Sequence, residues 1–286
     1  MGLRIQNNVE AFNAHRTLTA TSAQASKSME KLSSGYRINR ASDDAAGLAM
    51  SEKMRGQIGG LAQAQRNAQD GISLVQTAEG SLSEVHSMLQ RVRDLKVQHG
   101  NGTLSTDDQS AIESEIGQIG SEIKSIVDNT KFNGTKLLDN TTGFKFQVGA
   151  NDGETISTGA IGLSAAAGTA GTGGLSEIMG ISDAASAKAA LSSGGSLSTI
   201  ANVDNFVKNV SNVRGNLGAI QNRLESRLNN LATYQENLTA SESRIRDVDM
   251  AAEMTKFTKL GILQQAGTSM LAQANQAPQG VLSLLR

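Results

Sequence analysis

A run of apolar residues in the last third of the chain recurs at alternating steps of three and four positions. It comprises Val203, Phe206, Val210, Val213, Leu217, Ile220 and Leu224, and continues through Leu228, Leu231, Leu238 and Ile245. Because an α-helix makes one turn in about 3.6 residues, this spacing places the apolar side chains on one narrow face. Such a face needs a partner helix along its length. The sequence therefore predicts a long helix with coiled-coil packing and a break in the repeat near Arg227.

The same periodicity predicts two further helices upstream. Residues 45–98 carry apolar side chains at helical spacing, and residues 42–44, with sequence SDD, are typical of a helix start. The next helix carries isoleucines at steps of four and three, and Thr106 with Gln109 predicts a capping box at its start. The fold class expected is mainly α: a long antiparallel coiled-coil-like helical rod in which the N- and C-terminal halves of the chain pack together.

Two segments between the helices differ in character. Phe144, Phe146 and Val148 alternate with polar residues, which predicts a small β-hairpin region. From residue 161 to 200, 28 of 40 residues are Gly, Ala, Ser or Thr. A stretch with so few large apolar side chains cannot bury a core of its own, so we expect a small cap or a mobile loop there.

Both ends of the chain carry apolar stripes at helical spacing. One comprises Ile5, Val9 and Phe12, and the other comprises Met250, Met254, Phe257, Leu260, Leu263, Met270 and Ala274. Residues 260–285 contain no charged side chain but five glutamines, which makes them too polar for a membrane span and too apolar for water. We expect this segment to pack against protein, either other copies or another region of the chain, with the two ends close together.

The single proline, Pro278, is expected to interrupt the last helix. The apolar residues that follow it are Val281, Leu282, Leu284 and Leu285. They are predicted to form an anchor that is buried between subunits of an assembly.

Composition and motifs argue against several functions. The chain has no cysteine, its three histidines are scattered outside any metal-binding motif, and it lacks the P-loop and GxSxG patterns of nucleotide-binding proteins and serine hydrolases. Its net charge of −1 provides no electrostatic footprint for nucleic acid or an anionic membrane. We expect no enzymatic activity, cofactor or metal. Residues 1–8 lack the apolar stretch of a secretory signal, so we expect export without a cleaved signal peptide.

Long motifs at both ends resemble bacterial flagellin closely. They are LSSGYRINRASDDAAGLAMSEKMRGQ at residues 32–57, NAQDGISLVQTAEGSL at 67–82, NLGAIQNRLE at 216–225, ENLTASESRIRDVDMAAEM at 236–254 and MLAQANQAPQGVLSLLR at 270–286. They occur in the family's order. The intervening residues, about 155–200, carry no family signature.

The resemblance implies a subunit of the extracellular flagellar filament, exported unfolded through the flagellum's own type III channel. It implies terminal helices that line the filament's central channel at 1–44 and 247–286, a helical rod at 45–156 and 201–246, and a variable insert at 157–200. The partners implied are other copies of the chain, the filament cap, the hook-filament junction proteins and an export chaperone. Straight helices with sliding seams can hold two packings of similar energy, which is how the family changes supercoil.

The family also presents a surface that vertebrate Toll-like receptors recognise. The residues that match its motif here are Gln90, Arg91, Leu95 and Glu115. Asp94 and Lys96 depart from that motif, the first being shorter than the usual Glu and the second larger than the usual small residue.

Two alternatives differ in what they require of the sequence. A hook-filament junction protein would share the N-terminal region but usually diverges from NLGAIQNRLE and QAPQGVLSLLR, which are both intact here. A secreted coiled-coil adhesin would need a ligand-binding middle, which the low-complexity insert does not supply.

Overall fold

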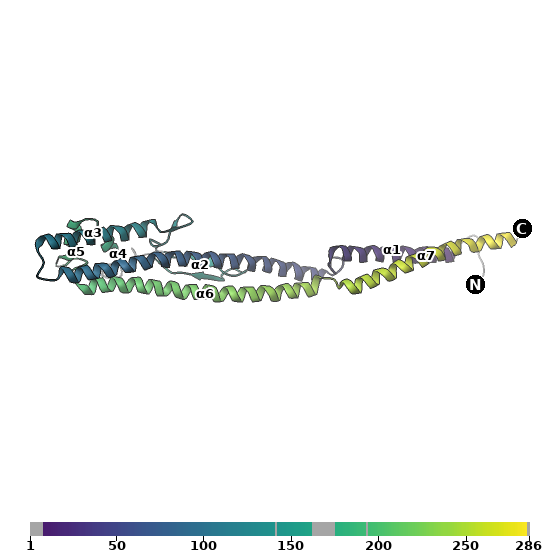
Figure 1. The fold of residues 1–286 in the computed structure, drawn as a ribbon. Helices are drawn as coiled ribbons and strands as arrows, with labels where there is room; N and C mark the ends of the chain where they lie inside the picture. The colour runs from purple at the N-terminus through teal and green to yellow at the C-terminus, as the bar shows by residue number, and fades with distance from the viewer. Residues whose placement is uncertain (1–7, 141, 162–174, 193, 285–286) are drawn as a thin grey trace. The chain divides into compact units, whose positions relative to one another are not determined.

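The computed structural model of the protein describes residues 8–140, 142–161, 175–192 and 194–284, with side chains for all of them except 175–176 and 277–284. The helices are α1 (Val9–Ser34), α2 (Ala45–His99), α3 (Thr106–Asn129), α4 (Leu175–Met179), α5 (Ala184–Leu191), α6 (Ile200–Arg246) and α7 (Met250–Leu284) (Figure 1). Among the described residues between α3 and α4 there are four short strands. The chain divides into two compact units: unit 1 comprises Met1–Ile58 and Glu236–Arg286, and unit 2 comprises Gly59–Gln235.

Unit 2 is built on the antiparallel packing of α2 and α6. Arg93 pairs with Asp204 at 2.7 Å, and Arg214 approaches Glu79 to 3.7 Å, so the two helices run in opposite directions. Most side chains of the predicted seam on α6 are buried here, while Val213 and Leu228 are partly buried. They pack with a matching row on α2 that comprises Val75, Ala78, Leu82, Val85, Leu89 and Val92. The last two residues of the seam, Leu238 and Ile245, lie in unit 1 and are partly buried. The mainly helical fold with long paired helices is confirmed.

The third helix of unit 2, α3, packs antiparallel against α2. The hydroxyl of Thr130, just after α3, donates to the Ser81 hydroxyl at 3.1 Å, and Arg91 of α2 pairs with Glu115. The predicted capping box is wrong by one residue. Ser105 is the N-cap and Asp108 its partner, because the Ser105 hydroxyl accepts from the Asp108 N–H while the Asp108 carboxylate accepts from the Ser105 N–H.

Two small antiparallel hairpins follow α3. The strands β1 (Lys131–Phe132) and β2 (Thr135–Lys136) are joined by Asn133 and Gly134, both at positive φ, as a type I′ turn requires. The strands β3 (Lys145–Gln147) and β4 (Thr155–Ser157) pair with Phe146 opposite Ile156. The predicted hairpin region is confirmed, and the Phe146 ring rests on α2 at Gly71, where a Cβ would lie 3.2 Å from it.

The described part of the low-complexity stretch is a cap, the first of the two expected alternatives. Its two short helices, α4 and α5, pack against α3, and Ile178, Ile181 and Leu197 are almost fully buried. Close approach requires glycine on α3. A Cβ on Gly120 would lie 2.5 Å from the Ile181 carbonyl oxygen, and a Cβ on Gly117 would lie 3.0 Å from the Asp183 carbonyl carbon. The glycines that weaken α3 as an isolated helix therefore create the seat for this cap.

Unit 1 contains the antiparallel pair α1 and α7. At one end the Asn8 amide donates to the Ala274 carbonyl at 2.7 Å, and at the other the Val248 N–H donates to the Gly35 carbonyl at 3.0 Å. Gly35 ends α1 in the left-handed conformation, with φ of 76°. The expected pairing of the two chain ends is thus confirmed for these described residues.

The close packing of the cap against Gly120 predicts opposite effects of two alanine substitutions on the free energy of unfolding. Gly120→Ala should lower the free energy of unfolding by roughly 1–3 kcal/mol, because the new Cβ overlaps the Ile181 backbone. Gly215→Ala on α6 should instead raise it by up to about 1 kcal/mol, because no atom lies within 4 Å of that position and alanine favours the helix. Urea unfolding followed by circular dichroism measures both; equal effects would contradict the packing.

Candidate assembly and recognition surfaces

The interface between α1 and α7 is narrow and made mostly of small side chains. Ala25 and Ser28 of α1 are buried against α7, and a Cβ on Gly267 of α7 would lie 3.2 Å from Leu18. At one end the Ser28 hydroxyl, hydrogen-bonded to Glu253, lowers the pKa of that carboxyl. Small residues bring the two helices close, but they cover only one face of each.

The apolar stripe of α7 consequently divides between two faces. Leu260 is 6% exposed and faces α1, and Phe257 is half-buried. Met254, Leu263 and Met270 point away and are 51%, 47% and 62% exposed. The interpretation of these residues as one stripe was wrong, because a helix turns by about 100° per residue and their spacing spreads them around much of its circumference. The face turned outward, with Ile262 also exposed, remains open to another chain.

On α1, the predicted terminal residues Val9 and Phe12 are likewise exposed, at 58% and 70%. Ile5 and Leu285 lie outside the described residues, as do the side chains of Val281, Leu282 and Leu284. The backbone of α7 continues as a helix past Pro278 to Leu284, so the expected interruption at Pro278 was wrong. Proline costs the helix one backbone donor there but does not end it.

A second cluster in unit 1 joins the break between α6 and α7 to the segment after α1. The Arg37 N–H donates to the Arg246 carbonyl at 2.6 Å, and Tyr36 forms a β-bridge with Asp247. The Arg246 guanidinium lies 4.8 Å from the centroid of the Tyr36 ring and pairs with Glu52 at 2.7 Å. Arg246 thus ties three segments together. The sequence analysis did not single it out, and its one signal was its place in a flagellin-like motif.

Asp43 organises the turn before α2. Its Oδ2 accepts from the backbone N–H groups of Asn39 and Arg40, and its Oδ1 pairs with the Lys27 ammonium at 2.6 Å. The Lys27 hydrogen bond, followed by that from Arg40, lowers the pKa of Asp43 from 3.8 to about 2. The neighbouring Asp44 caps α2, with its Oδ1 accepting from the Gly47 N–H at 2.9 Å.

The four residues of the predicted receptor surface do not all lie on the surface. Arg91 and Glu115 are joined by two contacts, with Nε and Nη2 of Arg91 at 2.8 and 2.7 Å from the same carboxylate oxygen. Gln90 is exposed and its amide lies 3.0 Å from His86. Leu95 is 1% exposed and belongs to the core of unit 2, so its place is beneath this patch.

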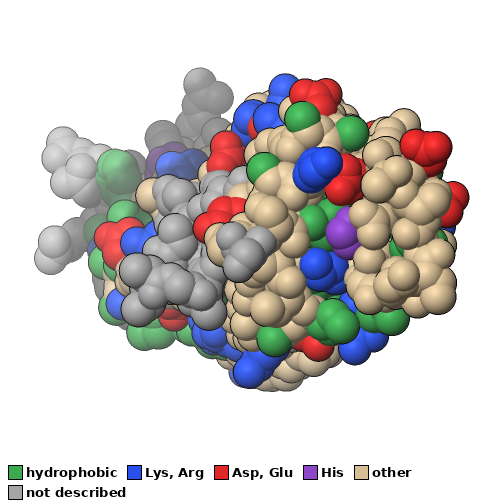
Figure 2. All heavy atoms as spheres, turned by 90° about the vertical axis from the view of Figure 1, so that its left-hand side faces the viewer, with side chains coloured by type: hydrophobic (Ala, Val, Ile, Leu, Met, Phe, Trp, Pro, Cys, Tyr) green, Lys and Arg blue, Asp and Glu red, His purple; other side chains and the backbone are tan. Residues whose placement is uncertain are grey.

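Neither a metal-binding cluster nor a membrane-spanning helix is found among the described residues. No group of three or more His, Cys, Asp or Glu side chains among them is placed to hold a metal ion, and no helix among them is long and apolar enough to cross a membrane. On the face drawn in Figure 2, acidic and basic side chains are interspersed. The surfaces that stand out are the apolar outer faces of the terminal helices.

Comparison with known proteins places the chain in a family. Residues 5–143 match the bacterial flagellin N-terminal helical region, and residues 200–285 match the bacterial flagellin C-terminal helical region. The chain is 50% identical to flagellin of Bacillus subtilis (strain 168), over 99% of this chain and 100% of that protein. It belongs to the bacterial flagellin family. It is also 52% identical to flagellin of Halalkalibacterium halodurans, over 99% of each chain.

A solved structure from Vibrio parahaemolyticus, described as a flagellar hook-associated protein, has a similar fold. The TM-score is 0.56, and the match covers 72% of this chain and all of that one at 16% identity. At this identity the likeness concerns the fold alone, whereas the identity to flagellins extends over the whole chain. Flagellins are structural proteins, so the chain is not an enzyme.

The Asp43 contacts predict how the stability of the turn before α2 depends on pH. Because the folded-state pKa of about 2 lies below the ordinary 3.8, the stabilisation from Asp43 is complete above roughly pH 5 and is lost as the pH falls toward 2. Asp43→Asn should therefore weaken the turn at neutral pH and flatten this acid dependence. Amide hydrogen exchange at Asn39 and Arg40 measures it, with Glu10→Gln on the exposed start of α1 as the control. Unchanged protection in Asp43→Asn would contradict the assignment.

Proposed function

We infer that the chain is a structural subunit that polymerises into the bacterial flagellar filament used for swimming. The observation that carries this is membership of the flagellin family along the full chain, joined to paired terminal helices whose outer faces are apolar and exposed. Exposed large apolar side chains on neighbouring turns mark a protein interaction surface. A second copy of the same helix pair is the partner that would cover them. The filament is extracellular, so this is also the proposed location of the chain.

We propose further that the chain divides by role as the family resemblance implies. Residues 1–44 and 247–286 would line the central channel, residues 45–156 and 201–246 would form the rod, and residues 157–200 would be the insert. The glutamines and apolar residues of α7 suit a helix that contacts packed neighbours on one side and a wet channel on the other. The cap, the junction proteins and an export chaperone would be the other partners.

Export in an unfolded state is supported by composition. The chain has one proline and no cysteine, so slow proline isomerisation and disulfide rearrangement contribute little to its refolding. A chain that must thread a narrow channel and fold again at its far end benefits when these slow steps contribute little.

Substitutions at two leucines of α7 should distinguish an effect on assembly from an effect on folding. Leu263→Ser should abolish or severely slow growth on filament seeds while lowering the monomer's melting temperature far less than Leu260→Ser, because Leu263 is half-exposed whereas Leu260 is buried. Leu260→Ser should lower the stability of unit 1 by roughly 2–5 kcal/mol, since that side chain is buried. Electron microscopy of the seeded polymer and thermal melting of the monomer report the two effects. Failure of the wild-type chain to form filaments would refute the proposed function.

Recognition by a vertebrate Toll-like receptor is a second proposed role, supported by the exposed Arg91–Glu115 pair with Gln90 beside it. Leu95 would act from below by holding α2 in place.

For this surface, Arg91→Ala should lower receptor signalling more than Lys96→Ala. Arg91 presents a guanidinium held in place by Glu115, and arginine is a common hot spot of interfaces whereas lysine is not. Reporter cells exposed to purified monomer measure the response, with circular dichroism confirming the fold of each variant. If both substitutions had equal and negligible effects on signalling, the proposed receptor surface would be wrong.

A further inference from the structure

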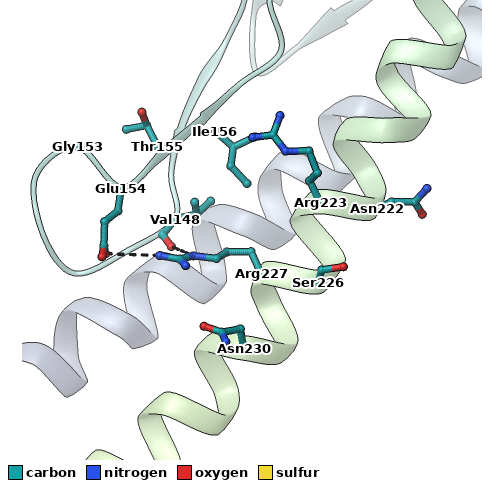
Figure 3. Close-up of a pocket in the computed structure, with 10 residues that line it drawn as sticks. All are labelled: Val148, Gly153, Glu154, Thr155, Ile156, Asn222, Arg223, Ser226, Arg227 and Asn230. Carbon is teal, nitrogen blue, oxygen red and sulfur yellow. Dashed lines mark hydrogen bonds and ion pairs between the residues drawn. The ribbon is translucent and has the colours of Figure 1, made fainter.

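A groove in unit 2 separates the β3–β4 hairpin from α6. Figure 3 shows Arg223 and Arg227 of α6 reaching toward Glu154 and Ile156 of the hairpin. The groove is also lined by Asn222, Ser226 and Asn230 of α6 and by Thr155 of the hairpin. The wall contributed by α6 is polar and carries two guanidinium groups. The helical repeat places its members on one side of α6, so the groove runs along the helix.

The hairpin side of the groove is held rigidly. The Arg227 Nε donates to the Val148 carbonyl at 3.1 Å, and its Nη2 lies 3.7 Å from the Glu154 carboxylate. The Gln147 side chain donates to the Asn151 carbonyl at 2.7 Å and the Asn67 amide donates to the Gln147 carbonyl at 3.0 Å, which ties the turn to α2. The groove is therefore formed before any partner arrives.

In this groove, the Arg223 side chain is the charged group that is available to bind a partner. It is exposed and reaches from α6 toward the hairpin beside Ile156, and it makes no hydrogen bond or ion pair within the part of the chain that the structure describes. Arg227, by contrast, is engaged with Val148 and Glu154. A single free guanidinium in this groove favours a carboxylate as its ligand, because its planar donors match the two carboxylate oxygens.

A complementary surface lies on α2 of the same chain. Asp70, Ser73, Thr77 and Glu84 are all exposed, and their spacing places them on one side of the helix. The hydroxyls of Ser73 and Thr77 donate to carbonyl oxygens one turn back, at 3.1 and 2.8 Å. These two short side chains of the acidic stripe therefore need no hydrogen-bond acceptor from a partner. Glu84 has no ion pair among the described residues.

We propose that the groove beside Arg223 receives the acidic stripe of α2 from a second copy of the chain, with the Glu84 carboxylate opposite the Arg223 guanidinium. The groove and the stripe are different surfaces, so the contact is head-to-tail, and such contacts build open helical polymers when the rotation between copies does not close into a ring. This inference rests on the proposed function and assigns one lateral contact of the filament. The outer faces of α1 and α7 are a separate surface.

Charge reversal tests the pairing. Arg223→Glu and Glu84→Lys should each raise the critical concentration for growth on seeds at least tenfold at low salt, because each brings like charges together. In the double variant the reversed charges attract again, and the critical concentration should return to within about threefold of the wild type. Lys208→Glu, an equivalent reversal at another exposed position of α6, is the matched control and should change growth far less.

The absence of cysteine permits an independent measurement. In Ser226→Cys the introduced thiol is unique, and its rate of maleimide labelling should fall at least tenfold between monomer and filament. Circular dichroism of every monomer confirms that the variants fold.

Normal growth of Arg223→Glu, absence of rescue in the double variant, or equal labelling in monomer and filament would each overturn this contact while wild-type filaments still form. Absence of wild-type growth would instead remove the proposed function, and this inference with it.

Discussion

Burial of the three-four apolar seam between α2 and α6 is the constraint on which unit 2 depends. Val203, Val210 and Leu224 lose all contact with water there, and burial of each such side chain contributes roughly 1.5–3 kcal/mol. With only eight aromatic residues in the chain, aliphatic packing along helices takes the place of a broad core. The hairpin and α3 attach to this pair, and the cap formed by α4 and α5 packs against α3.

Unit 1 differs from unit 2, because many apolar side chains of its helix pair are not buried. Small residues such as Ala25, Ser28 and Gly267 allow α1 and α7 to approach closely, while Met254, Leu263 and Met270 stay in water. A surface of this kind costs the monomer stability and supplies the filament with free energy of assembly. The polar cluster around Arg246 and Asp43 is different, since its hydrogen bonds and ion pairs join the segments between the helices of unit 1.

Local patterns carried the prediction of the helices and failed where distant segments decide the outcome. The periodic seam predicted α6, and the alternation at Phe144–Val148 predicted the hairpin region, because each pattern is read within one segment. The assignment of Leu95 to a surface came from a family motif, which names residues without saying which way they point. The Ser105 cap was missed because Ser105-Thr106 offers two overlapping capping patterns, and the choice depends on where the first turn closes.

The sequence by itself determined the helical periods, the family and the presence of apolar chain ends, since these depend on residue order alone. Tertiary structure decided which face of each terminal helix is buried. It also made Gly117 and Gly120, which weaken an isolated helix, the positions where the cap of α4 and α5 approaches α3 closely, and it paired Arg227 with the hairpin while leaving Arg223 exposed beside it. The physical reason is that burial and charge pairing are properties of contacts between segments far apart in the chain, and no local pattern records which segments will meet.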